Sequence, residues 1–256
     1  MRKWKEGVLL LGLAVGLTAA VATVADSVLP ASAEAGRLIP VYSVDTEEKK
    51  VAISFDAAWG NQHTGPILDI LDQYGVKTTF FLVDFWAEEF PEDVKEIAAR
   101  GHEIGNHSSS HPDMTQLTKE EIKAELTACG TRILELTGVQ PTLFRPPFGS
   151  YNNTLIETCR ECGYEVIQWS VDSLDWKDVT AEQVVERVIR STEKGSIVLF
   201  HNNAEQVEAY LPLVLEGLQS QGFQVVPVGE LIHKDNYRID HTGKQIAEEG
   251  VSGNGV

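Results

Sequence analysis

The chain has 256 residues, of which 43% are hydrophobic and 23% charged, a composition typical of a folded protein rather than a disordered one. Lys and Arg total 21 against 38 Asp and Glu, so the formal net charge is -17 at pH 7. This balance excludes the basic surface with which proteins bind nucleic acids. We therefore expect no nucleic-acid partner.

Residues 1–33 differ in composition from the rest of the chain. Three basic residues near the start precede an uncharged run from Gly7 to Ala25, and a stretch of small residues ends at Ala33. This order is typical of a secretory signal cleaved after Ala33, but the run is long enough to remain as a membrane anchor. In either case we expect the following domain to be extracytoplasmic, secreted or anchored to the outer face of the cytoplasmic membrane.

The remainder of the chain divides into a lead-in, one domain and a tail. Residues 34–50 contain two short apolar runs around a polar stretch, which predicts a hairpin. Extended and helical signals then alternate over residues 51–232 without a Pro-rich or Ser-rich linker, which predicts a single domain. Residues 233–256 are polar, end in a Gly-rich stretch and are expected to be frayed.

Seven apolar runs within the domain are expected to be strands: Val51–Phe55, Lys77–Val83, His102–Asn106, Thr142–Phe144, Glu165–Val171, Ser196–Phe200 and Phe223–Val228. Because helix-compatible segments fill the gaps, the strands should form a mainly parallel sheet or barrel of the α/β class. Two capping-box patterns, Thr118 with Glu121 and Thr180 with Gln183, predict helix starts.

The three cysteines do not suggest a disulfide framework. Their number is odd, and Cys129 falls on the apolar stripe of a predicted helix. Cys159 and Cys162 form a CxxC pair inside another predicted helix. We interpret all three as small core residues, with a redox or metal role as the alternative for the pair.

Several predicted strands lead into polar residues at their ends, namely Asp56, His107, Arg145, Asp172 and His201. In parallel α/β architectures the carboxyl ends of the strands form one face, and that face contains the active site. We therefore expect these five side chains to converge. Because a polar residue at a strand end contributes little to the core, Asp56→Asn should leave the fold intact.

Two of these motifs suggest a metal and an orienting cation. His107 and His111 have a spacing at which two imidazoles can bind one metal ion, although a catalytic zinc site usually has three protein ligands and no third is evident. Arg145 is followed by two prolines that hold it rigidly at the strand end. It either forms a structural salt bridge or orients a carboxylate such as Asp56 and lowers its pKa.

His201 and the stretch from Asp172 to Trp176 each have two interpretations. His201 follows an apolar strand and is either a core histidine or an acid–base group. Asp172 and Asp175 lie next to Trp176, an arrangement that suits holding a histidine and stacking a sugar. The alternative is a buried Trp with capping aspartates.

These segments together resemble the polysaccharide deacetylases, carbohydrate esterase family 4, also called the NodB-homology fold. The resemblance extends from about Val51 to Ile232 and includes five motifs in chain order: Ser54–Gly60, His107–His111, Arg145–Gly149, Asp172–Trp176 and Leu199–His201. It implies a distorted (β/α)7 barrel in a single domain. It also implies a metal-dependent deacetylase that hydrolyses N-acetyl groups of a glycan.

The resemblance implies a role for each motif residue. The acid–base residues would be Asp56 as general base, Arg145 as the residue that holds it, and His201 as general acid, oriented by Asp175 or, less favoured, Asp172. The remaining roles would be metal ligands (His107 and His111, binding a divalent ion such as zinc), an oxyanion-hole amide (Phe148) and the walls of an acetyl pocket (Trp176 and Leu199).

The chain departs from the family pattern at Ala57. The family usually has a second aspartate there, which is a metal ligand, so the departure implies weak metal binding. His63 is a possible replacement ligand, with an exposed loop histidine as the alternative. The Phe-Asp-x-x-Trp-Gly variant, together with the N-terminal segment, is similar to the sporulation branch of the family, the PdaB-like proteins.

The sequence therefore predicts a deacetylase acting on an extracytoplasmic glycan, and the expected substrate is peptidoglycan of the spore wall. The alternative is a non-catalytic carbohydrate-binding or structural barrel in spore formation that has lost its metal ligand set. Asp56 and His201 favour the enzyme, because a binding module needs no acid and base. Ala57 favours the alternative.

Overall fold

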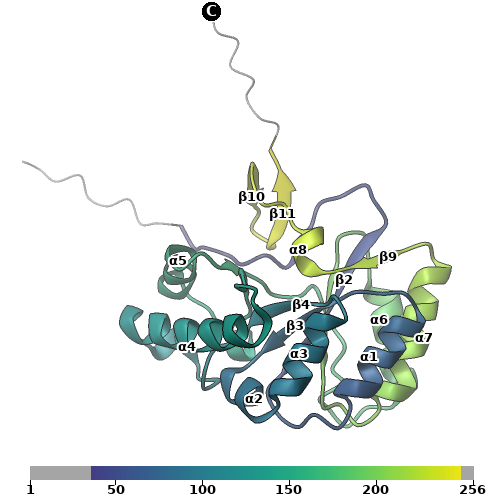
Figure 1. Ribbon diagram of the computed structural model, residues 1–256. Coiled ribbons are helices and arrows are strands. Elements are labelled where there is room, and N and C mark those ends of the chain that lie inside the picture. The colour runs from purple at the N-terminus through teal and green to yellow at the C-terminus, as the bar shows by residue number, and fades with distance from the viewer. Residues whose placement is uncertain (1–35, 249–256) are drawn as a thin grey trace, which may run out of the picture. The chain divides into compact units, whose positions relative to one another are not determined.

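The computed structural model describes residues 36–248 (Figure 1). The predicted signal or anchor in residues 1–33 lies outside these residues. Within residues 36–248, no helix is both long enough and apolar enough to cross a membrane.

The strands are β1 (Ser43–Val44), β2 (Lys50–Ala57), β3 (Thr79–Leu82), β4 (Glu103–Asn106), β5 (Leu143–Phe144), β6 (Glu165–Val166), β7 (Val171–Asp172), β8 (Ile197–His201), β9 (Gln224–Val226), β10 (Tyr237–Ile239) and β11 (Lys244–Ala247). The helices are α1 (Thr64–Gln73), α2 (Asp84–Glu89), α3 (Pro91–Ala99), α4 (Lys119–Thr137), α5 (Asn153–Glu161), α6 (Ala181–Ser191), α7 (Val207–Ser220) and α8 (Val228–Leu231).

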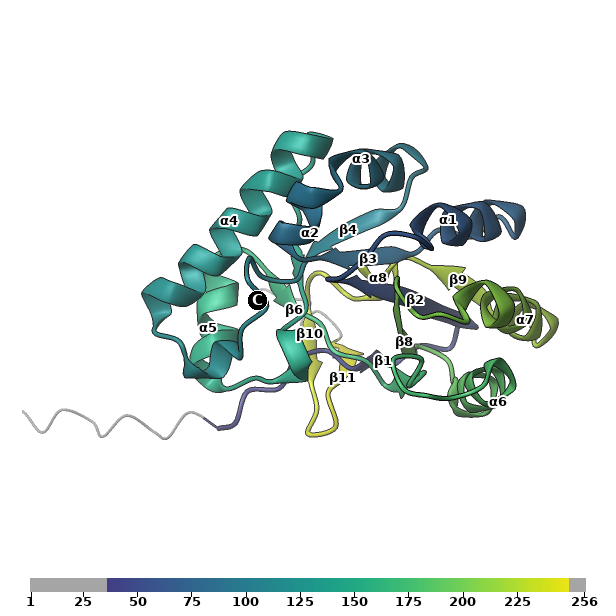
Figure 2. The ribbon, with the colours of Figure 1, turned by 90° about the horizontal axis from the view of Figure 1, so that it is seen from below.

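The main sheet is parallel and curves into a distorted barrel. Its strands follow the order β6-β5-β4-β3-β2-β8-β7, and β9 pairs with the start of β2. The segment from Glu165 to Asp172 contributes both end strands, because it pairs with β5 where it begins and with β8 where it ends. Helices lie along the outer side of the strands (Figure 2). The predicted α/β barrel is confirmed.

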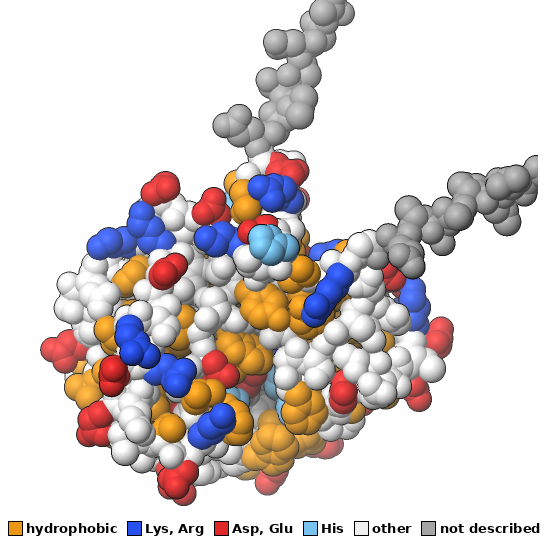
Figure 3. All heavy atoms as spheres, turned by 180° about the vertical axis from the view of Figure 1, so that it is seen from behind, with side chains coloured by type: hydrophobic (Ala, Val, Ile, Leu, Met, Phe, Trp, Pro, Cys, Tyr) orange, Lys and Arg blue, Asp and Glu red, His pale blue; other side chains and the backbone are white. Residues whose placement is uncertain are grey.

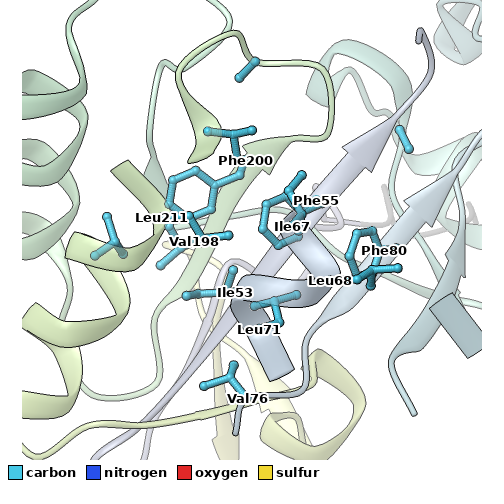
Figure 4. Close-up of a cluster of buried hydrophobic side chains, with 14 of the residues drawn as sticks. Ile53, Phe55, Ile67, Leu68, Leu71, Val76, Phe80, Val198, Phe200 and Leu211 are labelled. Atoms are coloured by element: carbon cyan, nitrogen blue, oxygen red, sulfur yellow. The ribbon is translucent and has the colours of Figure 1, made fainter. Parts of the chain in front are cut away.

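Strand β2 is buried on both faces, which explains its almost continuous apolar sequence. Ile53 and Phe55 pack in the cluster between the sheet and helices α1 and α7 (Figure 4). Ala52 belongs to a second cluster on the other face of the sheet. Because successive side chains of a strand alternate between its faces, Asp56 shares the face of Ala52. The strand therefore directs its one carboxylate away from the helices.

The seven predicted strands are all present, but one of them is divided. The run Glu165–Val171 leads into β6 and β7, which are separated by residues 167–170. The backbone N–H of Gln168 donates to the carbonyl of Val41 at 2.7 Å, while Ser170 donates to Ile197. The chain thus changes its hydrogen-bonding partner in the middle of the run, which apolar periodicity alone does not reveal.

The predicted hairpin in residues 34–50 is wrong. β1 pairs in parallel with β11, near the other end of the chain, rather than with β2. The backbone of Lys50 is already engaged, because its carbonyl accepts a hydrogen bond from Gly195 at 2.8 Å. Val44 in turn donates to the carbonyl of Gly195 at 2.9 Å. β1 therefore joins a separate three-stranded sheet.

The tail is ordered where fraying was predicted. β10 and β11 form an antiparallel pair that includes residues 237–247. The side chain of Gln245 is completely buried and bonds both the N–H and the carbonyl of His233, at 2.7 and 2.8 Å. These bonds to the backbone and the pairing with β1 hold the polar sequence in place. The last eight residues, 249–256, lie outside the described part.

The predicted helix starts and the interpretation of the cysteines agree with the structure. Both capping boxes form, at Thr118 with Glu121 and at Thr180 with Gln183. All three cysteines are free. Cys129 and Cys159 are completely buried, and Cys162 packs against the same cluster as Cys159. The interpretation of the cysteines as small core residues is thereby confirmed.

His102, at the base of the sheet, makes stability depend on pH. It is 6% exposed, and its Nδ1 accepts a hydrogen bond from the Thr78 N–H at 3.2 Å. Burial lowers its pKa from 6.5 to about 4. Since an unfolded histidine keeps a pKa near 6.5, the unfolded state binds more protons between pH 4 and 6.5, and stability falls as the pH falls through this window.

We expect this one histidine to contribute about 3 kcal/mol to the loss of unfolding free energy between pH 7 and pH 4. His102→Asn keeps an acceptor for the Thr78 N–H and removes the titrating group. Its stability should therefore decline less with acid, as measured by urea unfolding at several pH values. His241→Asn, at an exposed position, is the matched control. Identical pH dependence in wild type and His102→Asn would contradict the assignment.

Candidate active site

The polar strand ends meet in one cavity of about 560 Å3. Asp56 and His201 occupy the same register position on the neighbouring strands β2 and β8. His107, His111 and Asp172 also line the cavity. On the molecular surface the cavity is a hollow with histidine atoms inside it and hydrophobic side chains around its edge (Figure 3). Arg145 lies behind it, completely buried.

Arg145 and Asp56 form a buried ion pair. The guanidinium Nη1 donates to Asp56 Oδ1 at 2.7 Å, and Nη2 donates to the carbonyl of Gln168 at 3.2 Å. The guanidinium lies over the ring of Phe81, 4.2 Å from its centroid. Gly105 makes this stacking possible, since a Cβ there would come within 2.5 Å of the Phe81 ring. The arginine is therefore fixed from several sides.

The ion pair keeps Asp56 ionised. Burial alone would raise the pKa of the Asp56 carboxyl, since the group is only 7% exposed. The charge of Arg145 opposes burial most strongly, and that of protonated His201 adds to it, so that the pKa of Asp56 lies below its usual value. Asp56 can therefore accept a proton at neutral pH.

His107 presents a free nitrogen to the cavity. Its Nδ1 lies 2.7 Å from the carbonyl oxygen of Arg145, so Nδ1 carries the proton that is donated there. Its Nε2 lies 3.5 Å from Asp56 Oδ2. Burial lowers the pKa of His107, which keeps the ring neutral. A lone pair on Nε2 thus faces the cavity, as in a metal-binding histidine.

His111 lies beside His107, with ring centroids 5.0 Å apart. Burial lowers its pKa to about 4, so it too is neutral at pH 7. Its loop is held by Glu125 of α4, whose carboxylate accepts hydrogen bonds from the backbone N–H groups of Ser109 and Ser110, each at 2.8 Å. The helix thereby fixes the segment that connects the two histidines.

The two histidines fit two ligands of a divalent metal ion, but the third is not supplied. Among residues 36–248, no three His, Cys, Asp or Glu side chains are grouped so that they could hold a metal. Ala57 is completely buried and has no donor. His63 does not replace the missing ligand, because its Nδ1 pairs with Glu208 of α7 at 2.8 Å. Any metal would be held by an incomplete protein ligand set.

His201 is tied to Asp175. Its Nδ1 lies 2.8 Å from Asp175 Oδ1, and its backbone N–H donates to Oδ2 at 2.9 Å. Burial alone would lower the pKa of His201, but the hydrogen bond and charge of Asp175 raise it above the usual value. Asp172 is engaged elsewhere, since it accepts a hydrogen bond from Leu174 N–H. Of the two aspartates, the structure therefore places Asp175 beside the histidine.

Tyr210 and Gln168 are part of this arrangement and were not predicted from the sequence. The Tyr210 hydroxyl of α7 donates to Asp175 Oδ2 at 2.6 Å. Gln168 is buried, accepts from Arg145 and donates to the carbonyl of Gly149. Gln168 could have been found from the sequence, because it is a polar residue inside the predicted strand Glu165–Val171. No sequence signal pointed to Tyr210, because it lies on the apolar face of a helix far along the chain.

Backbone strain is concentrated in the loops of the site. Five described residues other than glycine have positive φ, and four of them, Ser108, His111, Phe148 and Leu174, lie in these loops. Such conformations cost on the order of 1–3 kcal/mol each and persist only where the surroundings enforce them.

Trp176 and Leu199 line the same cavity, as does Phe148. The residues assigned through the resemblance are thus together in one place.

Comparison with known proteins identifies the family. The sequence matches the family model described as polysaccharide deacetylase over residues 43–167. It is 35% identical to a peptidoglycan-N-acetylglucosamine deacetylase of Bacillus cereus, over 75% of this chain and 92% of that protein. The chain belongs to the polysaccharide deacetylase family.

The fold is also similar to that of a family member described as a pseudoenzyme. The solved structure of this carbohydrate esterase family 4 protein from Bacillus anthracis superposes with a TM-score of 0.73 at 33% identity, over 75% of this chain and 68% of that one. A mutant of the same protein, described as having restored enzymatic activity, superposes equally well at 34% identity, over 75% and 70% of the two chains. The family therefore includes a protein described as a pseudoenzyme as well as proteins described as deacetylases.

The buried ion pair contradicts the expectation that Asp56→Asn leaves the fold undisturbed. This substitution leaves the Arg145 charge buried without a counter-ion. Arg145→Met likewise leaves the Asp56 carboxylate buried without a counter-ion. We expect each single variant to lose about 3–5 kcal/mol of unfolding free energy. The double variant Asp56→Asn/Arg145→Met should lose much less than the sum of the two single losses. Urea unfolding of all four proteins tests this, and additive losses would show that the two charges do not depend on each other.

Proposed function

We propose that this protein hydrolyses N-acetyl groups of peptidoglycan outside the cytoplasm, during sporulation. The observation that carries the proposal is the pair Asp56 and His201, placed side by side on adjacent strands with an ionised base and a raised histidine pKa. The peptidoglycan deacetylases among its relatives support the substrate class. The similarity to the PdaB-like branch supports the setting.

The two groups divide the proton transfers of amide hydrolysis. Asp56 accepts a proton from the attacking water as the new C–O bond forms at the acetyl carbon. Protonated His201 gives its proton to the departing amine nitrogen as the C–N bond breaks, and the products are acetate and a free amino sugar. Asp175 stabilises the charged form of His201 before the transfer. The Phe148 amide is proposed to donate to the developing oxyanion.

The proposed metal site consists of His107 and His111, completed by water, with the Asp56 carboxylate close to His107. A bound divalent ion such as zinc would polarise the acetyl carbonyl and lower the pKa of the attacking water. With two neutral histidines and no carboxylate at position 57, we expect weak binding.

A second candidate function is a glycan-binding barrel without catalysis. Ala57 favours it, because the missing carboxylate removes a metal ligand, and the related pseudoenzyme gives a precedent within the family. The retained ion pair and the His201–Asp175 bond favour the enzyme, because binding alone requires neither a base nor an acid.

Release of acetate from N-acetylated peptidoglycan fragments tests the proposal. Wild type should release acetate across a zinc series, and His201→Asn should lower kcat by at least about 100-fold, since acid–base groups contribute about 10²–10⁴-fold. His241→Asn is the control, because it also removes a histidine but at an exposed position away from the cavity. No release from wild type at any zinc concentration, with glycan binding retained, would leave the binding barrel as the function.

Zinc binding measured by calorimetry tests the metal site. We expect wild type to bind zinc weakly and His107→Ala to lose this binding. Ala57→Asp should bind zinc more tightly, because it adds an anionic ligand, and should be less stable without zinc, because position 57 is completely buried. Equal zinc affinity in wild type and His107→Ala would remove the proposed site.

A further inference from the structure

The exposed aromatic side chains of the described residues are gathered at one place. Six large hydrophobic side chains are exposed in residues 36–248. The aliphatic ones, Leu134, Val139 and Leu213, lie outside the cavity lining. The aromatic ones, Trp59, Phe148 and Trp176, are 58%, 68% and 59% exposed and all line the cavity. Single exposed aliphatic residues are ordinary on a protein surface, but three exposed rings around one cavity indicate a ligand.

Trp59 and Phe148 form a continuous strip with His111. The ring of His111 lies 5.1 Å from that of Trp59 and 4.7 Å from that of Phe148, edge to face in both cases. Trp59 also contacts Phe85, with centroids 6.4 Å apart, which supports it from behind. The two outer rings are therefore held in place while more than half of each side chain stays in contact with solvent.

The backbone also favours exposure of Phe148. Its φ of 59° is unusual for a residue with a large side chain. Pro147, immediately before it, is buried. An exposed phenylalanine on a strained backbone costs free energy twice, in conformation and in hydration. Despite the edge-to-face contact with His111, 68% of Phe148 stays exposed within residues 36–248, which points to a partner that covers the ring when bound.

We propose that Trp59 and Phe148 form a sugar-binding position beside the reacting pocket, which holds a neighbouring pyranose ring of the glycan strand. The C–H bonds of a pyranose form an apolar face that packs on an aromatic ring, while its hydroxyl groups stay in water. The roles implied by the family resemblance include the Phe148 amide and Trp176, but neither the Trp59 ring nor the Phe148 ring. The inference rests on the proposed function for the identity of the ligand. It predicts that the affinity of the protein for a glycan increases with the number of sugar units.

Calorimetric titration with β-1,4-linked N-acetylglucosamine oligomers of one to five units tests the inference. Wild type should bind longer oligomers more tightly than the single sugar. Trp59→Met keeps apolar bulk against His111 but has no aromatic face, and it should bind the pentamer about tenfold more weakly with little change for the single sugar. Trp59→Phe should retain most of the affinity for the pentamer. Leu213→Ala, which removes an exposed side chain from α7, is the matched control and should bind as wild type does.

The outcomes separate the inference from the proposed function. Wild-type affinity that does not increase with chain length, or absence of binding, would overturn the sugar position. Equal pentamer affinity in Trp59→Met and Trp59→Phe would show that the ring only packs against His111, which also overturns it. Acetate is measured in the same samples. Binding that depends on Trp59 without acetate release would refute only the enzyme, and release that Trp59→Met leaves unchanged in KM would refute only the sugar position.

Discussion

A charge buried behind the cavity organises this protein. The guanidinium of Arg145 has no contact with solvent, so the structure must provide a counter-ion, a stacking surface and carbonyl acceptors around it. Asp56 supplies the charge, Phe81 the surface and Gln168 a carbonyl. Each comes from a different segment of the barrel. The same contacts that neutralise the arginine therefore fix the ends of several strands and the orientation of the proposed base.

What the sequence predicted well was local. Apolar runs located the seven strands, and Thr118 and Thr180 located helix starts, because periodicity and capping depend on residues close together in the chain. What it missed depends on distant partners. β1 pairs with β11 some two hundred residues away, and Tyr210 reaches Asp175 from a helix. No pattern within either segment records such a partner.

The site combines a complete acid–base pair with an incomplete set of metal ligands. Motif positions predicted that Asp56, His107 and His201 would meet, since all follow parallel strands. The bond from His107 Nδ1 to a backbone carbonyl could not be predicted, although it decides which nitrogen faces the cavity. The strained loops show that free energy is still spent on this geometry, whichever of the two functions it serves.

The pairing of β1 with β11 places these two strands side by side at one pole of the barrel. Ser43 bridges to Ser196 at the start of β8, whereas the cavity lies beyond His201 at the end of the same strand. The strand β11 therefore lies on the side of the barrel away from the cavity, whereas residues 36–38 contact Tyr151 and Asn153, which follow Phe148 of the cavity lining.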